Sequence, residues 1–325
     1  MVNIRKLQKT GGESGSSFLV ILPKDWVERQ GLKKGHPVVV AEREDGCLII
    51  DPRLPKAGEP RSTSIHIESN LRWSITSKYL LGFDEIHVLS DKKITSSQRL
   101  ELEKIIKRFV ALEITEEDDH EIVIRCLVDP STLPVRKAMK RMNLLASRML
   151  DDAVMAFFAG NTDAAANINQ RDEEVDRLFF LIVRELRSAI QYPRMSEVMS
   201  IAPVEALDFR LAAQYLERIA DLSVEIAEHT AGPVEANIVK RIEPIVNRVK
   251  EMLSKSVANL FDFNSNKVDW VIKAERDLPH TIDKSREYIL SKSGDGPQSQ
   301  LYVLDILLRI GEAAKDIVDL ALPQG

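Results

Sequence analysis

Two segments in the second half of this chain carry the same helical pattern of apolar and acidic residues. Residues 216–228 read LERIADLSVEIAE, and residues 307–320 read LLRIGEAAKDIVDL. In the first segment, carboxylates stand at helical positions i, i+4, i+8 and i+11: Glu217, Asp221, Glu225 and Glu228. A helix gathers side chains at this spacing on one face, where like charges repel each other. Basic side chains, a cation or solvent must therefore offset the repulsion.

The repetition extends over a whole set of helices. From residue 135 onward, apolar residues recur at helical spacing, and breaks occur near Gly160, Pro193 and Gly232. The segment that begins at Met149 reappears in altered form at Met252. An internal repeat of about 90–100 residues predicts two stacked three-helix bundles. We place this all-α region at residues 136–325, with the repeats at about 136–232 and 236–322.

Composition limits the class of protein. The chain has 325 residues, of which 44% are hydrophobic and 29% charged, and its net charge is −5. No apolar run reaches the roughly 18–20 residues that a membrane span needs, and the start of the chain lacks the apolar stretch of a signal peptide. The only cysteines, Cys47 and Cys126, are too few for a disulfide framework. We expect a cytoplasmic protein without membrane insertion.

Residues 1–52 predict a small β-rich unit. The expected elements are strands at 2–7 and 17–22, a short helix at 24–30, and a hairpin of 37–42 with 47–51. So short a unit buries little by itself and usually dimerises. Basic residues outnumber acidic ones in residues 1–56, whereas acidic residues predominate in residues 151–235. The two regions should therefore meet partners of different charge.

Four sequence strings in the first unit resemble the swapped-hairpin DNA-binding family of AbrB, MazE and SpoVT type. They are RKL at 5–7, LPKDW at 22–26, LKKG at 32–35 and the glycine of GCLII at 46–50. The resemblance implies a dimeric swapped-hairpin β-barrel with a basic face. By resemblance, DNA would be contacted by Arg5, Lys6 and Lys9, with Arg29 or Arg43 helping. The alternative is that these cations are solvated and the unit only dimerises the protein.

A second, smaller module follows a Pro-rich linker at residues 53–61. Residues 62–130 alternate strand and helix patterns in the order β-α-β-α-β, which predicts a small two-layer α/β module. The segment contains no glycine-rich phosphate loop and no catalytic pairing. His66, His87 and His120 fall on three separate elements and are interpreted as surface or interface residues rather than as a metal site. A spacer or a dimer contact is the preferred role for the module.

The helical region resembles the PhoU family of phosphate-signalling regulators. The resemblance rests on acidic (Glu/Asp)-x-x-x-Asp turns, DEEVD at 172–176 and ERIAD at 217–221, within two three-helix repeats. In the second repeat Glu275 remains, but Pro279, Leu308 and Glu312 replace the other expected residues. One acidic cluster is therefore complete and the other is eroded.

The family resemblance also implies a metal site, because members of the PhoU family can hold metal clusters on these faces. Oxygen ligands suit iron, manganese or magnesium ions. By resemblance the ligands would be Asp172, Asp176, Glu217 and Asp221, with Glu225 peripheral. Two alternatives remain. In the first, the acids form a solvated face paired with Arg171, Arg210 and Arg218; in the second, the face receives a basic partner surface.

Together these features predict a homodimeric, DNA-binding transcriptional regulator of phosphate uptake, in which the helical domain is the sensor or relay. The combination of domains resembles archaeal regulators. The alternative is an interaction protein that does not bind DNA and that restrains a phosphate transporter ATPase or a signalling protein. An enzyme is not expected, because no nucleophile is paired with a base. The predicted fold is multidomain α+β.

Overall fold

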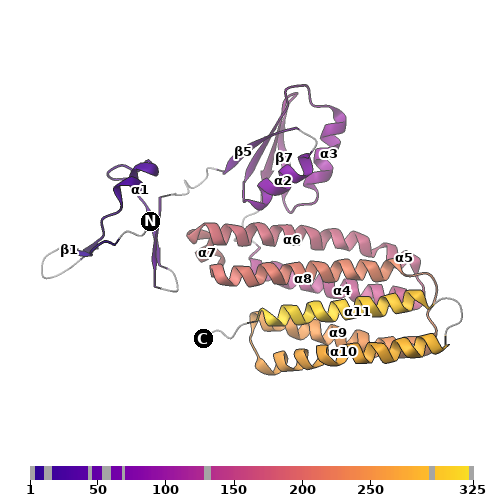
Figure 1. Ribbon diagram of the computed structural model, residues 1–325. Helices are drawn as coiled ribbons and strands as arrows, with labels where there is room; N and C mark the ends of the chain where they lie inside the picture. The colour runs from indigo at the N-terminus through magenta and orange to yellow at the C-terminus, as the bar shows by residue number, and fades with distance from the viewer. Residues whose placement is uncertain are drawn as a thin grey trace. The chain divides into compact units, whose positions relative to one another are not determined.

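The structure is a computed structural model that describes residues 4–10, 17–42, 46–52, 60–67, 70–127, 133–292 and 297–321. The chain divides into two compact units, Met1–Glu59 and Pro60–Gly325. The second unit holds the α/β module, residues 60–127, and the helical domain, residues 133–321 (Figure 1). Residues 53–59 of the expected linker lie outside the described residues.

The first unit consists of two hairpins and a short helix. Its elements are β1 (Gln8–Thr10), β2 (Ser17–Leu19), α1 (Lys24–Arg29), β3 (Val39–Glu42) and β4 (Leu48–Asp51). The first strand lies at 8–10 instead of the expected 2–7, because its backbone pairs with β2 and Gln8 stands opposite Leu19. Helix α1 ends at Arg29, close to the predicted end, and Gly31 follows with a φ of 64°, which is easy for glycine. Residues 11–16, the expected Gly/Ser loop, lie outside the described part of the chain.

The described residues of the first unit form no apolar core of their own. The exposed large apolar side chains include Ile4, Leu7, Phe18, Leu19, Val20, Ile21, Val40 and Leu48. The hairpins form two separate two-stranded sheets, β1-β2 and β3-β4. No closed barrel forms among the described residues of this single chain, so the predicted swapped-hairpin barrel is not seen. A barrel closes only when each edge strand finds a partner, and here the strands of one chain are too few.

The α/β module has one more strand than the sequence predicted. Its elements are β5 (Ser62–His66), α2 (Leu71–Leu80), β6 (Glu85–Leu89), α3 (Ser96–Ile106), β7 (Leu112–Glu117) and β8 (Glu121–Cys126). The sheet order is β5-β6-β8-β7; β5 runs parallel to β6, and the other pairs are antiparallel. The prediction missed β7 because its sequence, LEITEE, buries one residue and carries three acids, as an edge strand can.

Helices α2 and α3 supply the apolar layer of this module. Tyr79, Ile86, Leu102, Ile122 and Ile124 are fully buried in its core. Helix α3 begins with a capping box, in which the Thr95 hydroxyl accepts from the Gln98 amide and the Gln98 side chain accepts from the Thr95 amide. Ser96 and Ser97, whose residue type is also common at N-caps, lie in the first turn of the helix instead. Thr95 takes this role because Gln98 lies three residues after it.

Two repeats, each built on three long helices, form the helical domain, and the first repeat also contains the short helices α5 and α7. The first repeat contains α4 (Val135–Ala159), α5 (Thr162–Ala166), α6 (Ile168–Gln191), α7 (Pro193–Met199) and α8 (Pro203–Glu228). The second contains α9 (Ala236–Phe261), α10 (Ser265–Lys292) and α11 (Gln298–Asp319). The chain is interrupted at Asn167, between the short helix α5 and the long helix α6. Pro193 both follows α6 and begins α7, where its missing N–H costs nothing.

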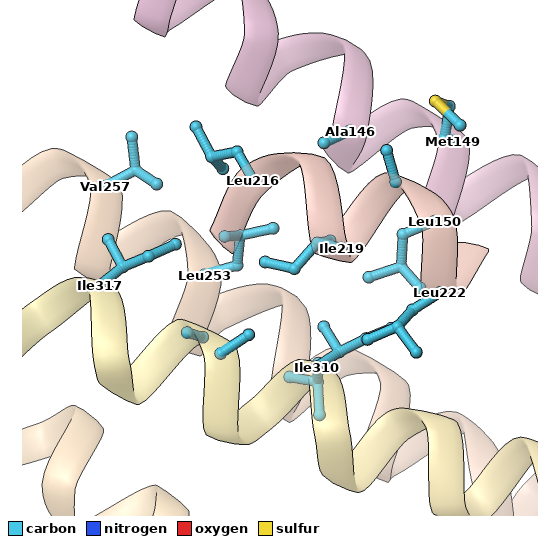
Figure 2. Close-up of a cluster of buried hydrophobic side chains, with 14 of the residues drawn as sticks. Ala146, Met149, Leu150, Leu216, Ile219, Leu222, Leu253, Val257, Ile310 and Ile317 are labelled. Carbon is cyan, nitrogen blue, oxygen red and sulfur yellow. The ribbon is translucent and has the colours of Figure 1, made fainter. Parts of the chain in front are cut away.

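One continuous core joins the two repeats. Figure 2 shows apolar side chains of α4, α8, α9 and α11 meeting between the bundles. Leu150, Leu216, Ile219, Leu253 and Ile310 are all buried in this layer. Each helix presents an apolar stripe at helical spacing, which is what the sequence pattern predicted. The charged residues Asp172, Asp176, Glu217 and Asp221 of α6 and α8 lie outside this core.

Gly160 fixes the end of the first helix of the repeat. Its φ of 66° is left-handed, and a Cβ at this position would collide with the backbone of Gly232 and Pro233. Only glycine satisfies both conditions. The turn after α4 therefore packs against the connection between the two repeats.

Candidate functional site: an acidic cluster on α6 and α8

Four of the predicted site residues come together on two packed helices of the first repeat. Asp172 and Asp176 lie one turn apart on α6, and Glu217 and Asp221 lie one turn apart on α8. Helices α6 and α8 pack against each other along their length. We call these four carboxylates the acidic cluster. All four side chains are partly buried.

Burial and mutual repulsion make ionisation of the cluster unfavourable. Burial, followed by the charges of Asp176 and Asp221, raises the pKa of Asp172 to about 6. Burial, followed by the charges of Asp221 and Asp176, raises the pKa of Glu217 to about 7. The pKa values of Asp176 and Asp221 are also raised, chiefly by burial. The cluster therefore favours any cation that approaches it.

Arginine side chains approach the cluster from two directions. The guanidinium of Arg108, in the α/β module, lies 3.9 Å from a carboxylate oxygen of Asp176. The positive charges of Arg108 and Arg72 lower the pKa of Asp176 against the effect of burial. On α8 itself, Arg218 lies 3.9 Å from Asp221 and 3.7 Å from Glu225. The protein thus supplies part of the balancing charge.

Glu225, the fifth predicted ligand, has a different environment. One of its carboxylate oxygens accepts a hydrogen bond of 2.9 Å from Arg309 on α11. This ion pair joins α8 of the first repeat to the last helix of the second. Glu225 therefore stands at the junction of the repeats and beside the acidic cluster rather than within it.

Two of the arginines expected to pair with the acids have other partners. Arg171 pairs with Asp152 of α4. Arg210 contacts Gln214, and the Gln214 amide donates a 2.8 Å hydrogen bond to Glu217. Of the three expected arginines, Arg218 is the one that pairs directly with a cluster carboxylate. The cluster is consequently less neutralised by its own helices than the sequence suggested.

The acidic cluster does not fit a metal ion in this arrangement. Among the residues that the structure describes, no group of three or more His, Cys, Asp or Glu side chains is placed to hold one. A carboxylate oxygen of Asp172 is buried without a hydrogen-bond partner. That oxygen could accept a hydrogen bond or contact a cation. However, the described side chains do not bring three ligands together around it. Binding of iron, manganese or magnesium at these residues stays a prediction.

The corresponding face of the second repeat is different. Glu275 of α10 is followed one turn later by Pro279, and α11 carries Leu308 and Glu312 at the equivalent positions. Glu312 is exposed. Lys315, on the same helix, pairs with Asp319 at 2.5 Å. Here the remaining acids are solvated or are balanced by a lysine of their own repeat.

The predicted DNA-binding residues lie in the other unit. Arg5, Lys6, Lys9 and Arg29 are all exposed. Arg43 lies outside the described residues. Arg5 and Lys6 precede β1, Lys9 lies within it, and Arg29 is the last residue of α1. Their role in binding DNA stays a prediction.

Sequence reasoning missed the residues that join the α/β module to the cluster. Arg108 lies just after α3 in an ordinary polar stretch, and no local pattern relates it to α6. Arg184 gave a clearer signal, because it interrupts the apolar run FFLIVRELRSAI. A charged residue within such a run is rarely buried without a specific partner.

A cavity of about 670 Å³ lies where the module meets α4 and α6. Phe109, Leu112 and Leu178 are among its apolar lining residues, and charges of both signs, including Lys107 and Glu174, stand around them. The mixed charge selects no particular class of ligand.

Comparisons with known proteins agree on the helical region. Residues 139–230 match the family model of the PhoU domain. A phosphate-specific transport system accessory protein PhoU homolog of Clostridium acetobutylicum is 25% identical over 148 residues. That alignment covers 46% of this chain and 57% of the relative, so the chain spans little more than half of the relative's length.

Two solved structures also align with this chain over most of their own length. The crystal structure of PhoU from Pseudomonas aeruginosa has a TM-score of 0.43 and 16% identity, and the match covers 59% of this chain and 95% of that one. The phosphate transport system regulatory protein PhoU from Streptococcus pneumoniae has a TM-score of 0.45 and 14% identity, with coverages of 57% and 91%. No helix among the described residues is long and apolar enough to cross a membrane. The part of this chain that is similar to the PhoU domain is residues 139–230, which fall within the first repeat.

Proposed function

We propose that this chain is a PhoU-type accessory protein that restrains phosphate transport by binding a component of the transport system. The observation that carries the proposal is the position of the acidic cluster: all four carboxylates lie within the residues that match the PhoU domain. The C. acetobutylicum relative is described as a phosphate-specific transport system accessory protein, which supports the same role. The partner would be the transporter's ATPase or a signalling protein.

The chemistry of the cluster suits a basic partner surface. Its carboxylates are half-buried, and burial raises their pKa values. Lysine or arginine side chains of a partner would relieve the repulsion and form charge-assisted hydrogen bonds. Complementary charges of this kind also speed association and discriminate between partners. We therefore assign binding to the face of α6 and α8.

Phosphate uptake in cells tests the proposal. Deletion of the gene should raise uptake of radiolabelled phosphate in phosphate-rich medium, because the restraint on the transporter is lost. Expression of the wild-type chain should restore low uptake, whereas a chain carrying Glu217→Gln and Asp221→Asn should not. Uptake that is unchanged by the deletion would contradict the proposal.

For the first unit we propose dimerisation with a second copy of the chain. The supporting observation is the set of exposed apolar side chains, among them Leu7, Phe18, Ile21 and Leu48, in a unit without a buried apolar residue among those described. Apolar surface of that extent is normally covered in a stable protein. Light scattering should give a dimer for the full chain and a monomer for a chain lacking residues 1–57. A monomeric full chain would overturn this part.

DNA binding is a second candidate function for the same unit. The observation in its favour is the exposure of Arg5, Lys6 and Lys9 around the first strand. Fluorescence anisotropy at two salt concentrations, with DNA from upstream of phosphate-transport genes, should then show salt-dependent binding. Substitution of the three cations by alanine should abolish it. No binding by the wild-type chain would leave dimerisation as the role of the unit.

A further inference from the structure

The sheet of the α/β module carries charged side chains on the side opposite its apolar core. On β6, Ile86 and Val88 point into the core, so the alternating residues Glu85 and His87 point to the other side. Strand β8 pairs with β6 and brings Glu121 to the same side. We call this side the charged face of the module. On it, His87 lies between a carboxylate of its own strand and one of the neighbouring strand.

Both ring nitrogens of His87 lie within hydrogen-bond distance of a carboxylate oxygen. Nδ1 is 2.6 Å from Glu121, and Nε2 is 2.7 Å from Glu85. An ionised carboxylate only accepts hydrogen bonds, and a neutral imidazole carries a hydrogen on only one of its nitrogens. The positively charged ring, with a hydrogen on both nitrogens, is therefore the form that donates to both carboxylates. Loss of a proton leaves a nitrogen lone pair facing a carboxylate.

Glu85 is held in place by groups other than His87. Its side chain is 9% exposed. It accepts hydrogen bonds from Arg125 of β8 at 2.7 Å and from the Ser62 hydroxyl of β5 at 3.2 Å. Arg125 also pairs with Glu116 of β7 at 3.2 Å. The network therefore includes a side chain from every strand of the sheet, and Glu85 has little freedom to turn away from His87.

The charge balance of the network depends on His87. Three carboxylates, Glu85, Glu116 and Glu121, stand against one guanidinium, that of Arg125. The protonated His87 ring supplies a second positive charge. Its hydrogen bond to Glu121 raises the pKa of His87 above the ordinary value of 6.5; burial acts in the opposite direction, and the bond to Glu85 adds to the rise.

Other titratable groups lie around the network. His66 of β5 is exposed on the charged face. Before β8, Asp118 accepts hydrogen bonds of 2.7 Å from the backbone amides of His120 and Glu121, and these bonds fix the turn that positions Glu121. Because both ring nitrogens of His87 already have partners, these groups act on His87 only through their charge.

Glu85 also adjoins the contact between the module and α6. The preceding residue, Asp84, accepts a hydrogen bond of 2.9 Å from Arg184 of α6, whose side chain is only 7% exposed. The Arg184 guanidinium also donates to the carbonyl oxygens of Tyr79 and Phe83, at 2.9 and 2.8 Å, so it anchors the module on the helix. The network on the charged face thus begins one residue away from this anchor.

We propose that His87 is a proton-dependent clasp that holds β6 to β8 on the charged face of the module. The protonated ring bridges Glu85 and Glu121, whereas the neutral ring bonds only one of them. The folded module holds this proton more tightly than the unfolded chain does. The clasp therefore contributes fully below about pH 6.5, and its contribution is lost as pH rises through the raised pKa of His87. This inference goes beyond the proposed function, since it requires neither phosphate nor a transport partner.

Hydrogen exchange of the full chain at about pH 6 and about pH 9 tests the clasp. Each rate is divided by the rate of an unstructured peptide at the same pH to give a protection factor. In the wild type, protection of the β6 and β8 amides should fall about fivefold from the lower to the higher pH. His87→Gln should abolish this fall, because glutamine does not titrate. The matched control is His66→Gln, which removes an exposed histidine of the same face and should behave as the wild type does.

Titration of the histidine rings by NMR gives a second readout on the full chain. Glu121→Gln should lower the pKa of His87, because it removes the carboxylate that raises this pKa most. Glu101→Gln removes an exposed carboxylate of α3 and should leave the pKa of His87 unchanged. The acidic cluster titrates in the same range, but it is present in every variant, so the differences between variants report on His87. The proposal would be overturned by wild-type protection that is equal at both pH values, by an equal fall in His87→Gln, or by an unchanged pKa in Glu121→Gln.

Discussion

The two repeats of the helical domain share a fold but differ on one face. The first repeat keeps its four carboxylates, Asp172, Asp176, Glu217 and Asp221. At the equivalent positions, the second has Glu275, Pro279, Leu308 and Glu312. The apolar stripes of both repeats are kept, because both must bury them in the common core. Packing therefore preserved the helices, and the acids of the second repeat were free to change.

The source of the balancing charge also differs between the repeats. In the second repeat Lys315 stands on the same helix as Asp319, its partner. In the first repeat one of the cations, Arg108, comes from the α/β module. A basic residue on the same helix stays near its acid in every arrangement of the chain. A basic residue on the α/β module lies near α6 only while the module packs against that helix. Among the described residues, the acids of the first face are therefore the ones that receive a balancing charge from the α/β module.

The largest expected effect comes from removing the anchor that joins the module to the first repeat. Arg184→Ala should destabilise the contact between α6 and the end of α2 by about 3 kcal/mol. The guanidinium's hydrogen bonds are lost, and the carbonyl oxygens of Tyr79 and Phe83 are left without that donor. Hydrogen exchange in α2 should rise strongly. Arg187→Ala, at an exposed position one turn later on α6, is the control and should have little effect. A small effect of Arg184→Ala would mean that the first face does not depend on docking.

The next effect concerns the close packing of the second repeat. A Cβ at Gly311 of α11 would meet the side chain of Leu278 on α10, whereas the first repeat accommodates Ala220 at the equivalent position. Gly311→Ala should therefore cost about 2 kcal/mol through overpacking. Urea unfolding of the full chain measures this loss. A variant as stable as the wild type would mean that the Leu278 side chain moves aside. The second repeat would then accommodate alanine at this position as the first repeat does.

A smaller change, and one that increases stability, is expected when the acidic cluster loses a carboxylate. Burial and neighbouring acids raise the pKa of Glu217 from 4.5 to about 7. Between these pH values the folded chain holds a proton that the unfolded chain has lost, so stability falls as pH rises through this window. Glu217→Gln should remove that slope and stabilise the chain at pH 8 by about 1 kcal/mol, a value reduced for solvent screening.

The matched control for this experiment is Glu312→Gln in the second repeat. Glu312 is exposed, so the substitution should change stability little at any pH. His87 of the α/β module complicates the raw profile. Hydrogen bonds to Glu121 and Glu85 raise its pKa, so the stability it contributes is also lost as pH rises. The difference between Glu217→Gln and the wild type isolates the cluster. Equal slopes in the two proteins would contradict the assignment.

The smallest effect is expected from the lysine of the second repeat. Lys315→Ala removes an exchangeable ion pair with Asp319, four residues further along the same helix. Pairs of this kind contribute only about 0.4 kcal/mol. Thermal unfolding at low salt measures the loss, and added salt should reduce it. A loss several times larger would show that the second face also depends on its cation.

The sequence predicted those parts of the fold that depend on local pattern. Apolar periodicity located the long helices, as with α4 and its end at Gly160. Edge strand β7 was missed because its acids hide the weak alternation of Leu112 and Ile114. The acidic cluster was predicted from spacing on two helices, and those helices pack together. The contact of Arg108 with Asp176 joins residues far apart in the chain, and no local pattern encodes such a pair.

The most direct test is the affinity of the full chain for the purified ATPase subunit of the phosphate transporter from the same organism. Biolayer interferometry should compare the wild type with Glu217→Gln/Asp221→Asn in the first repeat and with Glu275→Gln/Glu312→Gln in the second. The account predicts that the first pair weakens binding at least about tenfold and that the second pair leaves it unchanged. Equal weakening by both pairs, or by neither, would contradict the claim that the first repeat alone carries the functional face.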